Sequence, residues 1–504
     1  MKKHILIRKN SYFDSVELMR ISGILRKDEG VEDAQLIMGS DANKQFLIDM
    51  GLNEQDFSDA TSLDLIIYFE LVDSLSTEVI LEKFDEILSL KDSGISDEYS
   101  PRSIEGALKI YSDINFILIS LPGEHASWEA KNALREGKNV MIFSDNVTIS
   151  EEIEIKKLAL EKGLMVMGPD CGTSIINEIP LGFANKVRKG KIGLISASGT
   201  GLQAVTCEIH NLGEGISQAI GIGGRDLSSE VGGITMKTAI TALINDPETE
   251  VIVLISKPPA PEVAEDIMNM LKESEMPFVL YFIHSNLKSD NNNVFIAKNL
   301  SHTAGLAVEL LKGNRDKKDL ETFNLQFEEF DIPELKTGKF IRGLYTGGTL
   351  ADEAIVNLEK SGNKVYSNIH YKPEYKLENP LNSKDNTIID LGDDFFTRGR
   401  PHPMIDPESR IEKLEQELTD PETGVILLDI VLGSGSHEDM AGALLPVLKK
   451  EKGEKIILAY VLGTDLDFQD KNMQVSKLRD VGVHIFESHI SMIYFANEIL
   501  KGKK

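Results

Sequence analysis

An internal repeat constrains the fold of this chain more than any other feature of its 504 residues. The segment DPETEVIVL (246–254) returns as DPETGVILL (420–428), so the match runs from a polar turn into an apolar run typical of a buried strand. A second pair lies upstream in the same order, IGLISASGTGLQAVTCEIHNLG (192–213) and IRGLYTGGTLADEAIVNLEKSG (341–362). Each member of this pair has the pattern of a strand, a Gly/Thr turn and an amphipathic helix ending at glycine. The repeat predicts two homologous α/β domains, at 189–312 and 338–504.

Apolar strand-like runs alternate with helical patterns from about residue 114 onward, for example in NFILISL (115–121) and NVMIFS (139–144). This alternation predicts an α/β fold with several Rossmann- or flavodoxin-like domains, each a parallel sheet covered by helices. The remaining parts are assigned as an N-terminal α/β region (1–111), a Rossmann domain (112–188) and a charged linker (313–337).

Composition and charge narrow the class of partners. The formal net charge is −27, which argues against binding to a nucleic-acid backbone or an anionic membrane but allows a local pocket for a small anion. No apolar run is long enough for a signal peptide or a membrane span. The two cysteines, Cys171 and Cys207, fit a reducing compartment and have no metal-ligand spacing around them. We therefore expect a cytoplasmic protein without a metal centre.

The two Gly/Thr turns of the repeat are candidate anion sites, because a helix start presents free backbone N–H groups and the positive end of the helix dipole. If the homologous domains pack around a pseudo-two-fold axis, the two starts face one another and suit a phosphate or an acyl phosphate. The alternative is that both turns are inherited packing geometry. The candidate phosphate-binding residues are Ser198, Gly199, Thr200, Gly201, Gly347, Gly348 and Thr349.

Polar loops between the repeated segments supply further candidates. GIGGRDL (221–227) offers Gly223, Gly224 and Asp226 for substrate binding and Arg225 for catalysis, or it is a surface turn with a solvated charge pair. TRGRPHPMID (397–406) concentrates Arg398, Arg400 and His402 at the equivalent point of the second repeat. His437 follows the strand VILLDIVL, where ligands gather in open α/β sheets, although it fits a helix-cap neighbour equally well.

These motifs resemble the acyl-CoA synthetase superfamily typified by succinyl-CoA synthetase. The segments GPDCGTSIIN (168–177), GKIGLISASGT (190–200) and NDPETEVIVLI (245–255) are similar to its α-subunit. GLYTGGTLADEAI (343–355) and LTDPETGVILLDIVLG (418–433) are similar to the carboxyl-terminal domain of its β-subunit. The union of both in one chain, after the start ILIRKNSYFDSVELMRIS and with DLGDDFFTRGRPHPMIDP (390–407), resembles the FdrA family.

In the synthetases that this chain resembles, the two helix starts flank a phosphohistidine. That residue relays phosphate between nucleotide, acyl phosphate and CoA. This chain departs from that pattern in three ways. No segment resembles the nucleotide-binding ATP-grasp domain, no loop cleanly matches the Gly-His-Ala-Gly type of phosphohistidine motif, and the glycine-rich CoA turn is absent from the start of the chain. CoA binding is therefore in doubt.

The FdrA resemblance implies a subunit of oxamate carbamoyltransferase in allantoin catabolism, working with co-encoded partner subunits. Carbamoyl phosphate or phosphate would then be a substrate, with no cofactor certain. The arginines would bind a carboxylate or stabilise charge, and His402 or His437 would move the amide proton. Two alternatives stay open, a subunit of an acyl-CoA ligase and a non-catalytic ligand-binding regulatory subunit. A homo-oligomer is also open.

Overall fold

The computed structural model describes residues 2–11, 13, 15–26, 28, 30–72, 75–92, 101, 103–285, 287–322, 331–398, 400–451 and 453–502. The chain divides into two compact units, of which the first comprises 1–114 with 396–401 and the second comprises 115–395 with 402–504. Among the described helices, none is both long and apolar enough to cross a bilayer.

The first unit contains a three-stranded sheet in the order β1-β3-β2, in which both pairs are antiparallel. Its elements are β1 (Lys2–Arg8), α1 (Ser15–Arg26), β2 (Val31–Met38), α2 (Asp41–Asp49), β3 (Leu65–Leu71), α3 (Thr77–Asp92) and α4 (Ile104–Ile110). Leu18 of α1 and Phe84 of α3 pack with Phe69 on one face of the sheet, and Leu47 of α2 packs with Tyr68 on the other. The parallel pattern expected for the chain therefore begins after this unit.

The second unit opens with a small parallel sheet of order β4-β5-β6. Its elements are β4 (Phe116–Ile119), α5 (Gly123–Arg135), β5 (Asn139–Ile142), α6 (Ile149–Glu161) and β6 (Val166–Met167). This is the expected Rossmann-type alternation, in a sheet of three strands.

A seven-stranded sheet follows, with the order β13-β12-β11-β9-β10-β7-β8. Its elements are β7 (Thr173–Ile176), β8 (Ile179–Gly182), β9 (Lys189–Ser196), α7 (Gly199–Asn211), β10 (Ile216–Gly221), α8 (Ile234–Ile244), β11 (Val251–Ser256), α9 (Pro261–Lys272), β12 (Phe278–Phe282), β13 (Val294–Ile296) and α10 (Leu300–Leu311). The boundary expected at residue 189 divides this sheet, since β7 and β8 already belong to it. Helix α11 (Lys317–Thr322) lies in the expected linker, of which 323–330 is outside the described residues.

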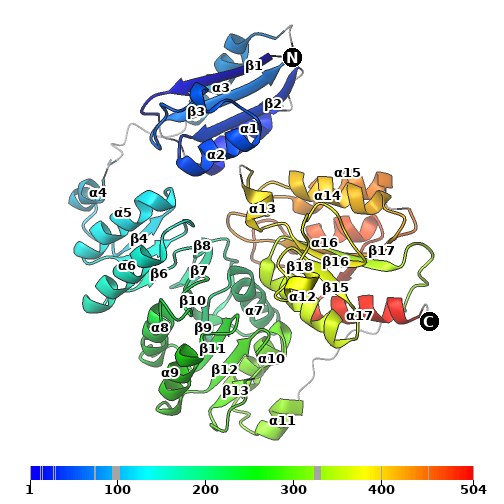
Figure 1. Ribbon diagram of the computed structural model, residues 1–504. Coiled ribbons are helices and arrows are strands. Elements are labelled where there is room, and N and C mark those ends of the chain that lie inside the picture. Colours follow the sequence, from blue (N-terminus) through cyan, green and yellow to red (C-terminus); the bar gives the residue numbers. More distant parts are fainter. Residues whose placement is uncertain are drawn as a thin grey trace. The chain divides into compact units, whose positions relative to one another are not determined.

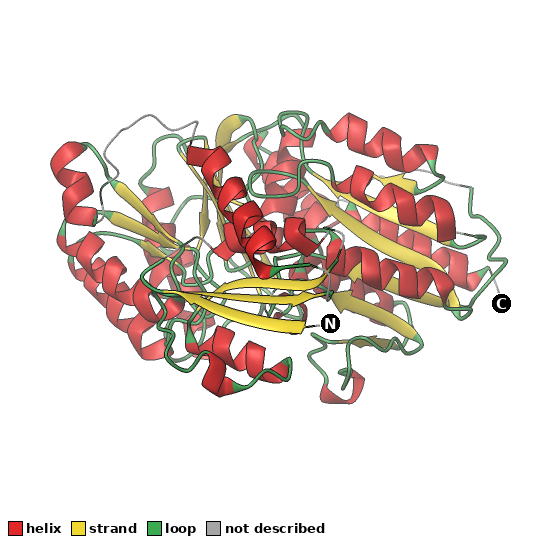
Figure 2. Cartoon of the chain, turned by 90° about the horizontal axis from the view of Figure 1, so that it is seen from above, coloured by secondary structure: helices red, strands yellow, loops and turns green. Residues whose placement is uncertain are grey.

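A six-stranded parallel sheet completes the second unit, with the order β15-β16-β14-β17-β18-β19. Its elements are β14 (Phe340–Tyr345), α12 (Gly348–Lys360), β15 (Val365–Ser367), β16 (Asn386–Asp390), α13 (Asp394–Thr397), α14 (Glu408–Thr419), β17 (Thr423–Val431), α15 (Met440–Glu451), β18 (Ile456–Leu462), α16 (Lys471–Asp480), β19 (His484–Phe486) and α17 (His489–Lys501). Figure 2 shows its strands lying between layers of helices.

The internal repeat is confirmed by strand order. In each large sheet the strand before the Gly/Thr turn (β9 or β14) pairs with the strand that follows the DPET segment (β11 or β17), and the next strands outward are β12 or β18 and β13 or β19. The α/β class is thus correct for the second unit, and its sheets are parallel except where β7 and β8 join the seven-stranded sheet antiparallel.

The two halves of the repeat share one apolar core. Helices α7 and α10 of the first half pack with α12 and α17 of the second half, as Figure 1 shows. One continuous cluster joins Leu194 and Val205 to Ile355 and Leu458. This packing brings the carboxyl ends of strands from both halves toward the starts of α7 and α12.

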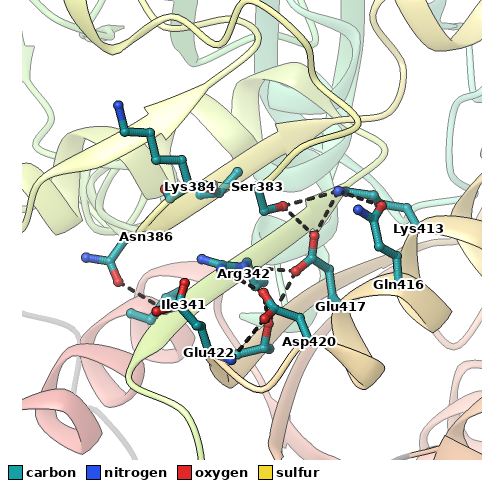
Figure 3. A network of polar contacts seen from close by, with 12 residues as sticks. Ile341, Arg342, Ser383, Lys384, Asn386, Lys413, Gln416, Glu417, Asp420 and Glu422 are labelled. Carbon is teal, nitrogen blue, oxygen red and sulfur yellow. Dashed lines mark hydrogen bonds and ion pairs between the residues drawn. The ribbon is translucent and has the colours of Figure 1, made fainter.

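A buried charge network fastens α14 to the start of β14. Arg342 donates from Nε to Glu417 Oε2 at 2.9 Å and from Nη2 to Asp420 Oδ2 at 3.0 Å. Lys413 Nζ approaches the other oxygen of Glu417 at 2.8 Å and donates to Leu381 O at 2.8 Å. Figure 3 shows Arg342 and Lys413 both directed at the Glu417 carboxylate, and the side chains of all three are at most 3% exposed.

Candidate functional site

The starts of α7 and α12 meet where the two halves pack. Ser198 caps α7, because its Oγ accepts a hydrogen bond from Gly201 N at 2.9 Å, and the same Oγ hydrogen-bonds to Thr349 Oγ1 in the first turn of α12. A Cβ added at Gly347 would lie 2.3 Å from Thr200 Cγ2, so this approach has room only for glycine. The expectation that the two turns face one another is confirmed, and their role as phosphate ligands stays a prediction.

Helix α12 begins without a capping side chain, since its cap residue is Gly347. The preceding loop is held by buried Asp429, whose carboxylate accepts hydrogen bonds from Thr346 N at 2.9 Å and Gly347 N at 3.1 Å. Arg410 Nη2 lies 3.1 Å from Asp429 Oδ1 and fixes that carboxylate in turn. The first amides of α12 therefore lack a capping side chain, and the helix dipole favours an anion beside them.

Asp390 stands at the end of β16, beside the start of α12. A Cβ added at Gly348 would lie 2.7 Å from Asp390 Oδ2, and Gly392 N donates to Oδ1 at 2.9 Å. Burial raises the pKa of Asp390 to about 7, the nearby charges of Asp393 and Asp429 add to that rise, and the Gly392 hydrogen bond opposes it. A carboxyl group that titrates near neutral pH can both accept and donate a proton under physiological conditions.

His402 approaches the same point. A Cβ added at Gly392 would lie 2.7 Å from His402 Nε2 and 3.2 Å from Asp390 Oδ1, so both side chains border this glycine. Met404 N donates to His402 Nδ1 at 3.2 Å, which leaves the proton of the neutral ring on Nε2. Burial lowers the pKa of His402 to about 4, so the ring is a neutral hydrogen-bond donor at pH 7.

The sequence therefore found His402 and missed Asp390. The signal available for Asp390 was its position at the carboxyl end of the apolar run NTIID (386–390), where parallel sheets place ligand-binding groups. We call the facing starts of α7 and α12, with Ser198, Thr200, Gly347, Gly348 and Thr349, the clamp. Asp390 and His402 both border Gly392 at its edge.

Three family models match the chain. They are described as "AllF, heavy metal-associated domain" over residues 1–101, "CoA binding domain" over 187–284 and "CoA-ligase" over 344–497. The YahF protein of Escherichia coli (strain K12) is 42% identical over 514 residues, which cover 100% of both chains. The chain belongs to the YahF family. With a CoA-binding and a CoA-ligase model in one chain, this YahF-family protein is a member of the acyl-CoA ligase superfamily, as the motifs indicated.

Curated ligase subunits match about a third of the chain. The α-subunit of ADP-forming succinate–CoA ligase from Aquifex aeolicus (strain VF5) is 30% identical over 178 residues, covering 33% of this chain and 55% of that subunit. The ADP-forming sulfoacetate-CoA ligase subunit SqwL from Acholeplasma sp is 28% identical over 176 residues, covering 33% of this chain and 58% of that subunit. Among solved structures, PH0766 from Pyrococcus horikoshii OT3 covers 80% of this chain and 86% of its own, with 15% identity and a TM-score of 0.34.

The residues of the first unit do not fit a thiolate metal site. Both cysteines of the chain, Cys171 and Cys207, lie outside the segment that matches the heavy-metal-associated model, and both are buried. Within the described parts of the chain, no group of three or more His, Cys, Asp or Glu residues could hold a metal ion. The resemblance of this unit to a metal-associated domain is one of fold.

Helix α5 is the first helix of the small sheet. In dinucleotide-binding folds the phosphate sits on the first helix after a glycine-rich turn. Helix α5 begins at Gly123, where an added Cβ would lie 2.3 Å from Asp145 O and 2.7 Å from Asn146 O. The backbone of Asp145 and Asn146 therefore packs against the side of Gly123 where a side chain would stand, and CoA binding stays an open question.

Asp226 has a structural role instead of the expected substrate-binding one. Its carboxylate is fully buried and accepts hydrogen bonds from Thr235 N at 3.0 Å and Met236 N at 2.9 Å, which caps α8. Lys156 Nζ of α6 lies 2.6 Å from the same carboxylate, with its side chain 0% exposed. Both carboxylate oxygens of Asp226 have partners inside the protein, so the Asp226 side chain cannot contact a substrate.

The other candidates of that loop lie against neighbouring parts of the protein, and the Arg225 side chain is 41% exposed, so its catalytic role stays a prediction. Arg225, expected to be catalytic, forms an ion pair with buried Glu152 at 2.9 Å. A Cβ added at Gly223 would lie 2.2 Å from Pro169 O, and one at Gly224 would lie 3.5 Å from Asp170 Oδ2. The loop therefore joins the small sheet to the seven-stranded sheet, and Gly223 permits that close contact.

The remaining candidates divide between the units. Arg398 and Arg400 are exposed in the segment 396–401, which groups with the first unit, and their catalytic role stays a prediction. The backbone of His437 is hydrogen-bonded to the loop that contains His402, because His437 N donates to Met404 O at 2.7 Å. Its ring Nδ1 accepts a hydrogen bond from Asp439 N at 3.0 Å, as the helix-cap alternative expects.

Behind the clamp lie two buried carboxylates, each of which accepts a hydrogen bond from a tyrosine of the other half. Tyr281 of β12 donates to Glu353 of α12 at 3.4 Å, and Tyr460 of β18 donates to Glu208 of α7 at 3.5 Å. The two tyrosines hold equivalent places in the repeat. Each is the strand-register partner of a residue on the neighbouring strand, and that residue lies the same number of positions after the DPET segment in both halves. Ser301 Oγ also donates to Glu208 at 2.8 Å. The pseudo-two-fold relation thus extends into the core.

Glu208 makes the stability of the protein depend on pH. Burial raises the pKa of Glu208 to about 8, above the value of about 4.3 in an unfolded chain. The folded state holds the Glu208 proton more tightly, so the contribution of Glu208 to stability is greatest below about pH 4 and falls as pH rises toward 8. We expect Glu208→Gln to raise the free energy of unfolding at pH 8 by on the order of 3 kcal/mol, with the gain vanishing near pH 4.

Thermal unfolding of both proteins between pH 4 and 9 measures this difference. Glu265→Gln, at an exposed position of α9, is the matched control and should change Tm little at any pH. The same difference between Glu208→Gln and the unchanged protein at pH 4 and pH 9 would contradict the raised pKa.

Proposed function

We propose that this chain is the FdrA-type subunit of a carbamoyltransferase that moves a carbamoyl group between oxalurate and phosphate in allantoin catabolism. The clamp carries the proposal. Two helix starts from homologous halves touch through Ser198 and Thr349, and the start of α12 is uncapped by any side chain. Such a site favours a phosphoryl group, which carbamoyl phosphate and inorganic phosphate share.

The reaction is oxalurate plus phosphate giving oxamate plus carbamoyl phosphate. A phosphate oxygen attacks the carbamoyl carbon, a C–O bond forms, the C–N bond to the oxamate nitrogen breaks, and that nitrogen gains the proton that phosphate loses. Asp390, whose pKa is about 7, can take the proton from phosphate and pass it to the leaving nitrogen. His402 Nε2–H can stabilise the negative charge that develops on the carbamoyl oxygen.

No step of this reaction passes through CoA, a metal or a phosphorylated protein residue. Phosphate and carbamoyl phosphate are substrates, and the acyl phosphate does not need to be made on this chain. Co-encoded subunits are the proposed partners, because the chain does not resemble a nucleotide-binding domain that would supply ATP.

Phosphate-dependent cleavage of oxalurate tests the proposal, with the chain alone and with co-encoded subunits. We expect carbamoyl phosphate as product, and phosphate binding weakened at least tenfold in Gly347→Ala, since the new Cβ would overlap Thr200. Gly172→Ala is the control, because its Cβ would lie 3.8 Å from the nearest atom, in Phe183. Absence of carbamoyl phosphate under every combination would refute the carbamoyltransferase.

The second candidate is a subunit of an acyl-CoA ligase. It is favoured by the CoA-ligase model over 344–497 and by the succinate–CoA and sulfoacetate-CoA ligase subunits among the relatives. ATP-dependent thioester formation from CoA by this chain with its partners would support it. Phosphate binding without turnover in any combination would instead support a regulatory subunit.

A further inference from the structure

A second polar cluster adjoins α12 and takes no part in the clamp. Lys257 is the first residue after β11, His284 follows the end of β12, and Asp352 lies one turn into α12. Because β11 and β12 are neighbouring parallel strands, their carboxyl ends meet at one edge of the sheet. The packing of the two halves places Asp352 at that edge, between Lys257 and His284.

Asp352 is the anchor of this cluster. Its Oδ2 lies 3.0 Å from Lys257 Nζ and its Oδ1 lies 3.5 Å from His284 Nε2, with the Asp352 side chain 2% exposed. Burial would raise the pKa of Asp352, but the hydrogen bonds and charges of His284 and Lys257 outweigh burial and hold the pKa below its usual value. Asp352 is therefore an anion that orients both groups.

Lys257 and His284, which Asp352 orients, still have hydrogen-bonding groups available to a ligand. The Lys257 side chain is 65% exposed, so its ammonium keeps N–H donors toward solvent. Among the described residues, no hydrogen bond engages His284 Nδ1, and the His284 ring is packed against Tyr371 with centroids 4.3 Å apart. His284 also has a φ of 64°, a left-handed conformation that is unfavourable for a residue other than glycine. Such backbone outliers gather at functional sites.

The cluster of Lys257, His284 and Asp352 also interacts electrostatically with Asp390. The charge of Lys257 acts on the carboxyl group of Asp390, opposing the rise in the pKa of Asp390. Asp390 in turn borders Gly348 at the start of α12. A small molecule whose reacting end lies at Asp390 could thus present an anionic group to Lys257.

We propose that Lys257 and His284 bind the carboxylate that oxalurate and oxamate share, so that the site selects small amides bearing a carboxylate. This inference rests on the proposed function for the identity of those molecules. Asp352 is the positioning residue. Lys257 supplies the positive charge that makes the site bind oxamate in preference to neutral amides. The clamp holds the phosphoryl group, and the two anionic ends of the reacting pair occupy different places.

Calorimetric titration of the full chain with oxamate, with its neutral amide oxamide and with inorganic phosphate tests the inference without requiring turnover. We expect Lys257→Met to weaken oxamate binding at least tenfold and to leave phosphate binding within about twofold. Lys257→Arg should retain oxamate binding, which separates loss of charge from loss of folding. Lys237→Met, which removes an exposed lysine paired with Asp266, is the control.

Unchanged oxamate binding in Lys257→Met, equal weakening of oxamate and phosphate, or no oxamate binding by the unchanged protein would each overturn the inference. Equal affinity of the unchanged protein for oxamate and oxamide would overturn it as well. Oxamate binding that depends on Lys257, together with no carbamoyl phosphate in the enzyme assay, would refute the proposed reaction and leave the carboxylate site standing.

Discussion

Arg342→Met is expected to lower the free energy of unfolding by about 3 kcal/mol or more. Arg342 is one of two cations that neutralise Glu417, and the side chains of Arg342 and Glu417 are each 1% exposed. Removal of one partner from a buried ion pair leaves an uncompensated charge and typically costs about 3–5 kcal/mol. Lys413, at 2.8 Å from Glu417, remains as a partner, which favours the lower end of that range.

Chemical denaturation of the variant measures the loss, and a second substitution identifies its cause. If the unpaired charge is responsible, Glu417→Gln in the Arg342→Met background should restore part of the stability. Lys191→Met breaks the Lys191–Glu250 pair, which is exposed at 59% and 51% and should matter little. An Arg342→Met chain as stable as the unchanged chain would show that the network of Figure 3 contributes only packing.

Asp390→Asn is expected to lower kcat for carbamoyl transfer by about 10²–10⁴-fold, the usual contribution of a positioned acid–base group. The transfer begins with Asp390 deprotonated, so kcat/KM should rise with pH around the Asp390 pKa of about 7 and lose that rise in the variant. The profile is best measured with carbamoyl phosphate and oxamate as substrates, because inorganic phosphate itself titrates near neutral pH.

Asp393→Asn provides the matched control for that profile. The charge of Asp393 helps raise the pKa of Asp390, so its removal should move the rise in kcat/KM to lower pH without the large loss of kcat. A pH profile that is the same in both variants and the unchanged enzyme would exclude Asp390 as the acid–base group.

Residues that follow from the repeat were predictable from sequence. The paired turns at Ser198 and Thr349 face each other because equivalent strands hold equivalent places in two sheets that share a core. Lys257 and Asp390 were not found, because each sits singly at a strand end. Their importance depends on which strand ends the packing brings to α12.

The wrong prediction at Asp226, and the ion pair of Arg225 that the sequence did not indicate, have one physical origin. A glycine loop with a charged pair looks the same in sequence whether the charges face a ligand or a protein partner. The partners here are Lys156 and Glu152, one turn apart on α6, where the pattern EEIEIKKLALEK indicates an ordinary amphipathic helix. Nothing in that pattern marks Lys156 as fully enclosed.

The exchange of tyrosine partners between Glu208 and Glu353 also bears on how such a chain arises. Each half of the repeat buries a carboxylate that accepts one hydrogen bond from a tyrosine of the other half, in addition to a partner in its own half, so the two halves contribute to one polar network in the core. Halves bound in this way stay together through their interior and not through the peptide that connects them. A fused chain and a pair of separate polypeptides would therefore have the same core, and gene fusion could join such subunits without redesigning their interface.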